Sequence, residues 1–300
     1  MLEATKYVWL DGEFVRWEEA KIHTLTHTLH YGGGAFEGIR AYETSKGAAI
    51  FRIPEHVARL YYSASVIGLR LPYSSQDVAD VIVELVRRNG MRQCYVRPLA
   101  YYGYGVMGVN PAKAPAHLSI SCWSWGAYLP HPQVDMKVSK FIRIHPQSTV
   151  CDAKLCGHYV NSIQASLEIQ RGKYHEALLL DYKGHVAEGP GENIFIVKNG
   201  VLYTPRPGTI LLGITRATVL ELARREGWQA IEADLSLEEV LDADEAFLTG
   251  TACEIVPVRS INDRLLGGGS IGPLTARLRE LYSQAVHGEL PGGEQWVTWA

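Results

Sequence analysis

The apolar segments of this chain are short, and several pairs of them are joined by two-residue turns. Asp11-Gly12, Lys183-Gly184 and Asn199-Gly200 each stand between two runs of apolar residues. An Asp-Gly or Asn-Gly pair in this setting is typical of a β-hairpin, because both residues tolerate a positive φ. Hairpins mixed with helical patterns indicate an α+β fold rather than a doubly wound parallel sheet. No apolar run approaches the roughly 20 residues that a membrane-spanning helix needs.

Hydrophobic periodicity predicts the individual elements. Helices are expected from Pro54 to Gly68, from Ser75 to Asn89-Gly90, and over 159–171, 215–226 and 273–287. A further short helix is expected after Ser236, whose spacing to Glu239 matches a capping box. Strands are expected over 7–10, 13–16, 50–52, 94–102, 118–125, 177–181, 185–188, 193–197, 201–204, 246–249 and 255–258.

The chain has 300 residues, enough for two domains or one large one. The segment 126–133 contains Pro130 and Pro132 and has no hydrophobic periodicity, which is typical of a linker. We therefore expect a small N-terminal domain over 1–125, an interdomain linker over 126–133 and a large C-terminal domain over 134–300. Each domain is expected to mix helices and strands.

Charge and cysteine content exclude several classes of protein. Lys and Arg number 29 and Asp and Glu 32, so the net charge is −3, without the basic excess of nucleic-acid-binding domains. Residues 1–10 include Glu3 and Lys6 and lack the apolar core of a signal peptide. The five cysteines are widely spread, which favours free thiols in a reducing cytoplasm. We expect a cytoplasmic protein with neither a nucleic-acid partner nor a membrane partner.

Two generic motifs are present only in part. Residues 268–272 match G-x-S-x-G, the nucleophile elbow of hydrolases, but a glycine-rich loop precedes Ser270 where the elbow requires a strand. A serine hydrolase that uses Ser270 is therefore a remote alternative. Cys151, Cys156 and His158 match no common zinc-ligand spacing, and no second ligand pair follows. We expect no metal site.

Three polar, glycine-rich segments are more specialised than loops require. Lys154 lies among small and apolar residues before a predicted helix, a setting that removes hydration from a lysine and makes it nucleophilic. Glu188 ends a predicted strand before a tight glycine turn, where the backbone can approach a ligand closely. Thr215 begins a helix and Thr251 follows a strand, which suits a phosphate group. Singly, these are a surface lysine, a turn and an N-cap residue, but together they describe a pyridoxal 5'-phosphate (PLP) site.

In its ordered motifs, the sequence closely resembles the branched-chain amino acid aminotransferases of PLP fold type IV. The resemblance covers nearly the whole chain, from Tyr7 to Arg259. It rests on His30-Tyr31-Gly32, Phe36-Glu37-Gly38-Ile39-Arg40-Ala41-Tyr42, Tyr95-Val96-Arg97-Pro98, Met107-Gly108-Val109-Asn110-Pro111, Trp125-Gly126-Ala127-Tyr128-Leu129, Ala153-Lys154, Glu188-Gly189-x-Gly191-Glu192-Asn193, Gly213-Ile214-Thr215-Arg216 and Gly250-Thr251-Ala252. A single motif would be weak evidence, whereas the ordered set is highly specific.

The resemblance implies a role for each matched residue. Lys154 corresponds to the Schiff-base lysine, which also moves the proton between the substrate α-carbon and the cofactor. The other residues implied to bind PLP are Arg59, Ile214, Thr215 and Thr251 at the phosphate, Glu188 at the pyridine nitrogen, Tyr159 at the phenolic oxygen, Leu211 on the ring face, and Asn193 and Gly213 in the same motifs. Thr251 and Ala252 are implied to bind the substrate α-carboxylate through backbone N–H groups. The implied side-chain pocket comprises Tyr31, Phe36, Gly38, Tyr95, Arg97, Met107, Val109, Trp125 and Tyr128.

The implied activity is ping-pong transamination of L-leucine, L-isoleucine and L-valine with 2-oxoglutarate, which gives branched 2-oxo acids and L-glutamate. The aromatic and aliphatic pocket suits branched side chains. Arg97 with the hydroxyls of Tyr31 and Tyr95 can pair with the distal carboxylate of glutamate, and a buried structural ion pair is the alternative for Arg97. For Arg40, a salt bridge and a role in the site are both open.

In the family, Tyr31 and residues 107–109 reach the neighbouring subunit's site. The resemblance therefore implies a homodimer as the minimal active unit, and a hexamer is also open. The nearest alternatives share the fold: D-amino acid aminotransferase, (R)-selective amine aminotransferase and aminodeoxychorismate lyase. Tyr95-x-Arg97 and the Met-Gly-Val-Asn loop favour the branched-chain enzyme.

The chain departs from the family pattern near the lysine. His158 stands where many members have asparagine, and Cys151-Asp152 stands where proline or small residues are common. The spacing between Lys154 and Tyr159 is kept. We therefore expect the chemistry to be preserved and the surroundings of the two residues to differ.

Overall fold

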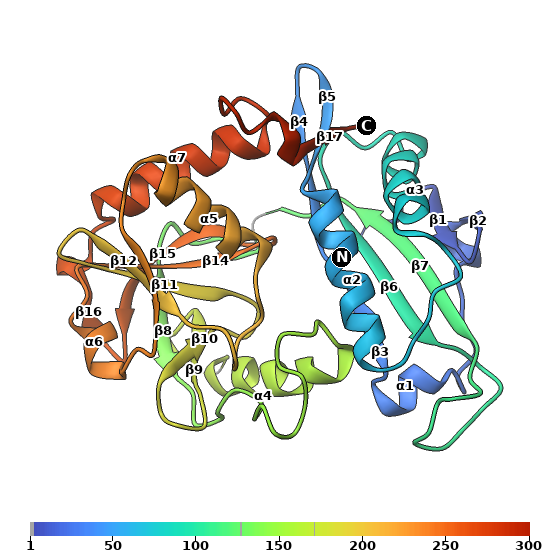
Figure 1. Ribbon diagram of the computed structural model, residues 1–300, viewed down its shortest axis with the longest axis horizontal. Coiled ribbons are helices and arrows are strands. Elements are labelled where there is room, and N and C mark those ends of the chain that lie inside the picture. The colour runs from blue at the N-terminus through green and yellow to red at the C-terminus, as the bar shows by residue number, and fades with distance from the viewer. Residues whose placement is uncertain (1–2, 127, 171) are drawn as a thin grey trace. The chain divides into compact units, whose positions relative to one another are not determined.

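The computed structural model describes residues 3–126, 128–170 and 172–300 (Figure 1). The chain forms two compact units. The first comprises Met1–Gly126, Ala153–Gly157 and Gln284–Ala300, and the second comprises Ala127–Asp152 and His158–Ser283. Each unit combines strands with helices, which confirms the α+β fold class. In the described ranges, no helix has the length and apolar character needed to cross a membrane.

These units trace the chain differently from the predicted boundaries at 125, 126–133 and 134. Residues 153–157 join the first unit, where Phe36 N donates a hydrogen bond to Lys154 O at 3.1 Å. Residues 284–300 also join it, because β17 (Val297–Trp299) pairs antiparallel with β5 (Gly47–Phe51). Ala127 of the predicted linker and Arg171 of a predicted helix lie outside the described residues. The division into domains stays a prediction.

The first unit is built on one sheet. Its remaining strands are β1 (Tyr7–Leu10), β2 (Glu13–Arg16), β3 (Gly34–Phe36), β4 (Ile39–Thr44), β6 (Cys94–Tyr102) and β7 (Ala116–Trp123). Its helices are η1 (Trp17–Glu19), α1 (His27–Tyr31), α2 (Ile53–Val66), α3 (Ser75–Arg88) and η4 (Glu294–Trp296). Over the described residues, the eight strands follow the order β17-β5-β4-β6-β7-β1-β2, and β3 pairs with β6. The predicted β1–β2 hairpin is confirmed, with Leu10 opposite Glu13.

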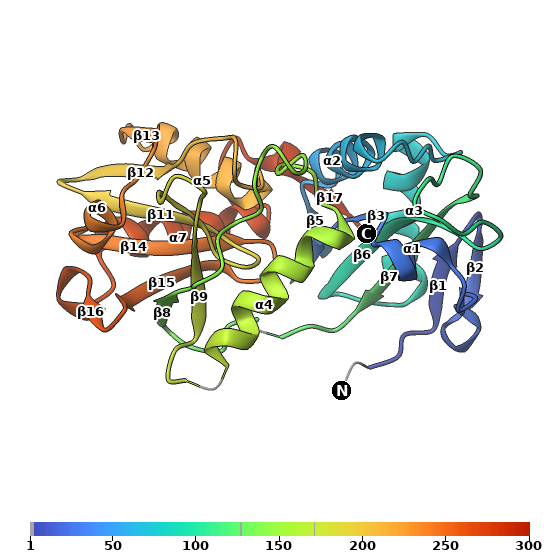
Figure 2. The same cartoon turned by 90° about the horizontal axis from the view of Figure 1, so that it is seen from below.

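Helices α2 and α3 pack against each other and cover one face of this sheet (Figure 2). Helix α2 begins with a proline, Pro54, in its first turn, where the missing N–H has no helical partner to lose. Helix α3 begins after Ser74, whose Oγ accepts a hydrogen bond from Asp77 N at 3.1 Å. Asp77 in turn accepts from Ser74 N at 2.8 Å, which completes a capping box.

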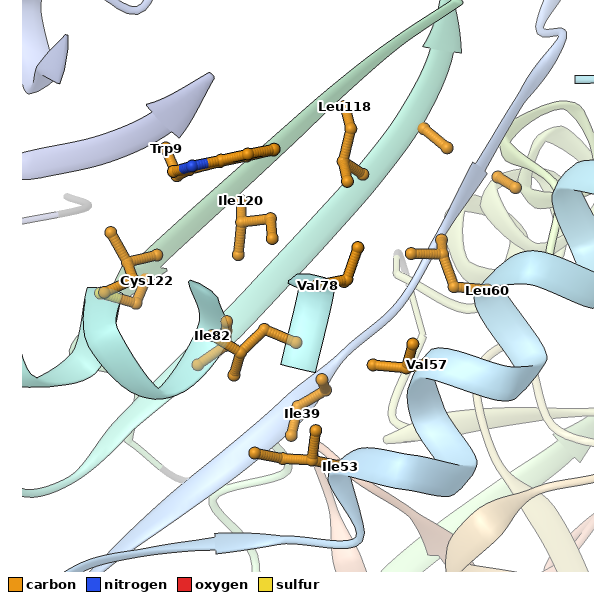
Figure 3. Packing of buried hydrophobic residues seen from close by; sticks show 14 of the residues in the cluster. Trp9, Ile39, Ile53, Val57, Leu60, Val78, Ile82, Leu118, Ile120 and Cys122 are labelled. Carbon is orange, nitrogen blue, oxygen red and sulfur yellow. The ribbon is translucent and has the colours of Figure 1, made fainter. Parts of the chain in front are cut away.

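Apolar side chains from both layers meet between the helices and the sheet (Figure 3). Ile39 of β4 and Ile120 of β7 face Val57 and Leu60 of α2 and Ile82 of α3. Ile39, Leu60, Ile82 and Ile120 are fully buried. This core fixes β3 and β4, and the turn between them carries Phe36, Glu37 and Gly38.

The second unit is built on a second sheet. Its strands are β8 (Val134–Val138), β9 (Glu176–Leu180), β10 (Val186–Glu188), β11 (Asn193–Lys198), β12 (Val201–Pro205), β13 (Ala230–Ala233), β14 (Glu245–Gly250), β15 (Glu254–Ile261) and β16 (Arg264–Leu265). Its helices are η2 (Cys156–His158), which begins in the first unit, α4 (Tyr159–Ile169), α5 (Ile214–Arg225), α6 (Leu237–Leu241), η3 (Gly267–Gly269) and α7 (Pro273–Val286), which ends in the first unit. Over the described residues, the nine strands follow the order β10-β9-β8-β15-β14-β11-β12-β13, and β16 pairs with β15.

Two features organise this second sheet. Phe195 of β11 and Phe247 of β14 lie opposite each other, and their rings stack at 5.1 Å between centroids. Helix α5 packs on β14, and α4 packs on β9. The predicted capping box is confirmed, since Ser236 Oγ accepts from Glu239 N at 3.2 Å at the start of α6.

Candidate active site

Lys154 is held by its main chain in the first unit. Its N–H donates to Ser63 Oγ of α2 at 2.9 Å, and its carbonyl accepts from Phe36 N at 3.1 Å. The side chain is half-buried, with Nζ 4.9 Å from the centroid of the Phe36 ring. Because a helix and a strand fix the backbone, the side-chain torsions supply the remaining movement of the amine.

A buried cluster of Glu37, His56 and Arg59 lies in the same unit. Glu37 accepts from Arg59 Nε at 2.6 Å, from Arg59 Nη2 at 2.9 Å and from His56 Nδ1 at 2.7 Å. Burial alone would raise the pKa of Glu37, but the charge of Arg59 and these hydrogen bonds hold it well below its usual range. Burial lowers the pKa of His56 and outweighs the attraction of Glu37. The imidazole is therefore neutral near pH 7 and donates to a charged carboxylate.

Arg97 lies among aromatic rings. Its guanidinium carbon is 4.9 Å from the ring centroid of Phe36, 5.4 Å from that of Tyr95 and 5.6 Å from that of Trp123. Its Nε is buried, and within the described chain it has no hydrogen-bond partner and no carboxylate at ion-pair distance. The structural ion pair considered for Arg97 is therefore absent from the described residues. A cation with an unused donor among apolar rings is suited to an anionic group of a ligand.

The other predicted pocket residues of the first unit adjoin Arg97. Tyr95 packs edge-on against Trp125 at 4.5 Å. A Cβ on Gly38 would lie 1.8 Å from Tyr95 Oη, so only glycine permits this approach. Arg40 donates to the carbonyls of Trp125 at 3.3 Å and Gly126 at 3.0 Å, which holds the end of the segment that follows β7.

Glu188 is the centre of a polar network in the second unit. It is buried, and one carboxylate oxygen accepts from Arg143 Nε at 2.5 Å. The other accepts from Asn193 Nδ2 at 3.0 Å and from Leu211 N at 3.1 Å. Three donors, one of them cationic, favour the charged carboxylate. Arg143 is missing from the predicted site, because it follows β8 in an aperiodic stretch whose local sequence carries no signal.

Gly213 and the start of α5 lie beside this network. A Cβ on Gly213 would lie 2.1 Å from Asn193 Oδ1, so this position also requires glycine. Ile214 and Thr215 occupy the first turn of α5 and are buried. The first backbone N–H groups of a helix have no intrahelical partner, and they form an anion site. Thr251 and Ala252 follow β14 and are half-buried, and the nearby Thr249 Oγ1 is a buried atom without a partner in the described chain.

Tyr159 is the first residue of α4 and is half-buried. The departure at His158 has a structural consequence, because its Nε2 lies 2.6 Å from Thr149 Oγ1. This contact ties the loop that contains Cys151 to the start of α4. Cys151 is buried, and burial raises the pKa of its thiol.

Tyr31, Met107 and Val109 form a separate cluster in the first unit. Met107 and Val109 are exposed, and Tyr31 Oη accepts a hydrogen bond from Gly108 N at 3.1 Å. Tyr128 belongs to the second unit and is also exposed. The predicted pocket residues are therefore divided between the units, and Phe36, Gly38, Tyr95, Arg97 and Trp125 are the ones that lie together.

The alternative sites gain no structural support. Ser270 is exposed and follows the turn η3, whereas a nucleophile elbow requires a strand at this point. Over residues 3–126, 128–170 and 172–300, no group of three or more His, Cys, Asp or Glu side chains is arranged to hold a metal ion.

The donor set fits PLP. A lysine with a fixed backbone, a carboxylate kept charged by Arg143, and a helix N-terminus beside Thr215 match the aldehyde, the pyridine nitrogen and the phosphate of that molecule. The unused donor of Arg97 and the unpartnered Thr249 Oγ1 leave polar atoms for further ligand groups.

Comparison with known proteins agrees with this chemistry. The model of the amino-transferase class IV family matches residues 34–261. The branched-chain-amino-acid aminotransferase of Pseudomonas aeruginosa is 42% identical over 302 residues, which cover 99% of this chain and 98% of that protein. The enzyme of the same name from Escherichia coli strain K12 is 39% identical and covers 97% and 96%.

Solved structures give the same result. A branched-chain amino acid aminotransferase complexed with N-(5'-phosphopyridoxyl)-L-glutamate, from the source abbreviated T.th., is 44% identical, with a TM-score of 0.96 and coverage of 100% of this chain and 99% of that chain. The complex of the T.th. enzyme with 4-methylvaleric acid is 43% identical, with a TM-score of 0.95 and the same coverage. The chain therefore belongs to the class IV aminotransferases, among the branched-chain-amino-acid aminotransferases.

Proposed function

We propose that this enzyme transfers the amino group of L-leucine, L-isoleucine and L-valine to 2-oxoglutarate, with PLP as its cofactor. The observation that carries the proposal is the position of Arg97 among Phe36, Tyr95 and Trp123, with a buried, unused Nε donor. The rings accept a branched aliphatic side chain, and the cation accepts the distal carboxylate of glutamate. One wall thus serves both substrates.

The relatives support both halves of this proposal. The T.th. enzyme is complexed with 4-methylvaleric acid, which has the carbon skeleton of leucine, and with a phosphopyridoxyl derivative of L-glutamate. For this chain we assign the side-chain pocket to Phe36, Gly38, Tyr95, Arg97 and Trp125, together with Tyr31, Met107, Val109 and Tyr128. The substrate α-carboxylate is assigned to the backbone N–H groups at Thr251-Ala252.

When bound, PLP supplies an electron sink that makes the α-hydrogen of the amino acid acidic. Lys154 holds the cofactor covalently between turnovers and, once released, carries the proton from the substrate α-carbon. Glu188, kept charged by Arg143 and Asn193, holds a proton on the pyridine nitrogen. Leu211 packs on the ring, beside Asn193 and Gly213, and Tyr159 donates to the phenolic oxygen.

The phosphate is assigned to Arg59, to the first turn of α5 at Ile214 and Thr215, and to Thr251. Arg59 is suited to this role because Glu37 uses Nε and Nη2 on one edge of its guanidinium. The donors of Nη1 lie on the other edge, and an arginine fork presents such a pair to phosphate bidentately.

We further propose a homodimer in the cytoplasm. Exposed apolar side chains gather on α1 and the loop that it holds, namely Leu29, Tyr31, Met107 and Val109. A second copy of the chain is the occupant that we assign to this surface, and the loop then completes the partner's site. The compartment is inferred from five cysteines that are all free thiols. Sedimentation of the wild type distinguishes dimer from hexamer, and Leu29→Asp is expected to yield a monomer with little activity.

The test of the activity is the absorbance spectrum of the purified enzyme. L-leucine is expected to bleach the visible band of the bound cofactor, and 2-oxoglutarate to restore it. Bleaching by D-alanine or (R)-1-phenylethylamine alone would overturn the substrate assignment and leave the cofactor site intact. Lys154→Ala should bind PLP without the visible band, whereas Lys140→Ala, which alters an exposed lysine, should behave as wild type.

A further inference from the structure

The main chain of Gly108 is held from both sides by helix α1. His27 Nε2 lies 2.7 Å from Gly108 O, and Gly108 N donates to Tyr31 Oη at 3.1 Å. His27 and Tyr31 are four residues apart, so they lie on one face of the helix, and their rings are 4.6 Å apart. Since Gly108 O can only accept, His27 Nε2 carries the proton and donates it.

His27 itself is rigidly placed. Its side chain is buried, its ring packs edge-on against Tyr102 at 5.8 Å, and its N–H donates to Gly103 O at 3.0 Å. Its other ring nitrogen, Nδ1, is buried and has no partner within the described chain. A buried nitrogen without a partner is destabilising, so packing alone does not explain an imidazole at this position. The bond from Nε2 to the loop does.

The loop 105–109 depends on these two bonds. Over the described residues, its hydrogen bonds are the two that involve Gly108. Met107 and Val109 on either side of Gly108 are exposed. Gly108 has a φ of +106°, which a residue with a side chain rarely adopts. The placement of Met107 and Val109 thus follows from the grip of α1 on the residue between them.

We propose that His27 is a positioning residue for substrate recognition, which acts by fixing the loop that carries Met107 and Val109. The inference rests on the proposed function, which places these two side chains in the pocket for the branched substrate. A loop held at one glycine by two bonds presents a fixed wall, and loss of one bond lets the wall move. Discrimination between branched and linear side chains of equal carbon count then weakens.

Three substitutions of His27 separate this role from a general structural one. The amide nitrogen of His27→Gln reaches the position of Nε2 and can still donate to Gly108 O. That of His27→Asn reaches only the position of Nδ1, and His27→Leu has no donor. His30→Leu is the matched control, because His30 lies on the same helix and bonds Thr24 O at 2.9 Å without touching Gly108.

The PLP-loaded enzymes are compared in two measurements. For His27→Leu and His27→Asn, we expect KM for L-leucine to rise about fivefold, as for the loss of one hydrogen bond, with kcat changed less than about twofold. Preference for L-valine over the linear L-norvaline should fall. Amide hydrogen exchange over 105–109 should accelerate by a similar factor. His27→Gln and His30→Leu should match the wild type in both measurements.

The outcomes distinguish this inference from the assignment on which it rests. If exchange over 105–109 does not change in His27→Leu, or if His27→Gln is no better than His27→Leu, the positioning role is refuted. If exchange accelerates but neither His27→Leu nor Met107→Ala changes KM, the loop is held as described but is not part of the pocket. If His27→Leu does not fold, Tyr31→Phe replaces it in the exchange measurement, because its exposed hydroxyl holds the same glycine. Unchanged exchange in Tyr31→Phe and His27→Asn would then refute the role.

Discussion

The guanidinium of Arg59 meets the carboxylate of Glu37 edge to edge, with Nε 2.6 Å from one oxygen and Nη2 2.9 Å from the other. Glu37 is fully buried, and His56 donates to it as well. This geometry fixes the plane of the guanidinium before any ligand arrives. An arginine that is already oriented loses less side-chain entropy when it binds a phosphate.

Removal of the charge of Glu37 should therefore affect both stability and cofactor binding. Glu37→Gln leaves Arg59 largely buried without its counter-charge, and we expect the free energy of unfolding to fall by about 3 kcal/mol. PLP should bind at least about tenfold more weakly. Urea unfolding of the enzyme without PLP and fluorescence titration with PLP measure the two effects. Glu43→Gln is the control, since Glu43 pairs with Arg92 at 2.7 Å on the surface and should change neither.

The same carboxylate predicts a direction for acid unfolding. The folded pKa of Glu37 lies below the ordinary value of 4.5, so the folded state binds fewer protons than the unfolded state as the pH falls. The contribution of Glu37 to stability is complete above pH 4.5 and declines below it. Glu37→Gln should thus be less stable than the wild type at pH 6 and should approach it below pH 4. A constant difference across this range would contradict the assignment.

Glu188 is expected to matter for catalysis more than for folding. Glu188→Gln keeps the shape of the side chain but loses the charge that Arg143 supports, so it cannot hold a proton on the pyridine nitrogen. We expect kcat to fall by roughly 100-fold, as for other preorganised electrostatic partners. Glu245→Gln is the matched control, because Glu245 is an equally buried glutamate that bonds Thr275 N at 2.8 Å and Thr275 Oγ1 at 2.6 Å. It should lower stability and preserve kcat.

The elements that could be predicted from the sequence are those with a local pattern. The Asp11-Gly12 turn and the alternation around it predict β1 and β2 with the observed bounds, and periodicity predicts α3. Strand β4 is missed because residues 39–42 are all buried, which leaves no alternation. Strand β17 has three residues and is extended because it pairs with β5, some 250 residues earlier.

The site divides in the same way. Lys154, Glu188 and Asn193 stand in motifs and can be named from the sequence, although their roles stay predictions. Arg143 is 45 residues from Glu188, and His27 is 81 residues from Gly108. Neither has a local signal, because each acts through a contact that only folding creates. Residues that hold the named site residues in place are therefore the part that the sequence analysis misses.

Gly38 tests the packing of the proposed pocket. In Gly38→Ala the new Cβ would lie 1.8 Å from Tyr95 Oη, and Tyr95 is buried between Trp123 and Trp125 at 5.4 and 4.5 Å. Because the ring cannot move freely, we expect a loss of about 1–3 kcal/mol in stability and at least about a tenfold loss in kcat/KM for L-leucine. Gly126→Ala, where a Cβ meets open space, is the control. Wild-type kinetics in Gly38→Ala would show that Tyr95 does not shape the pocket.

Glu176 is a buried carboxyl that the proposed mechanism does not use. It is 5% exposed, and burial raises its pKa to about 7, against a hydrogen bond from Ala177 N at 2.9 Å that favours the charged form. Its folded pKa lies above the ordinary value of 4.5, so the protonated form is favoured in the folded state. This contribution to stability is complete below pH 4.5 and is lost as the pH rises through 7.

Glu176→Gln removes this burden on the folded state. Relative to the wild type, we expect the free energy of unfolding to rise by up to roughly 3 kcal/mol at pH 8 and to change little at pH 5. Urea unfolding at the two pH values measures the difference. Glu245→Gln supplies the contrast, because its carboxylate accepts several hydrogen bonds at the start of α7 and its loss should destabilise the protein. A Glu176→Gln variant that is destabilised at pH 8 would mean that the charged carboxylate has a partner that stabilises the fold.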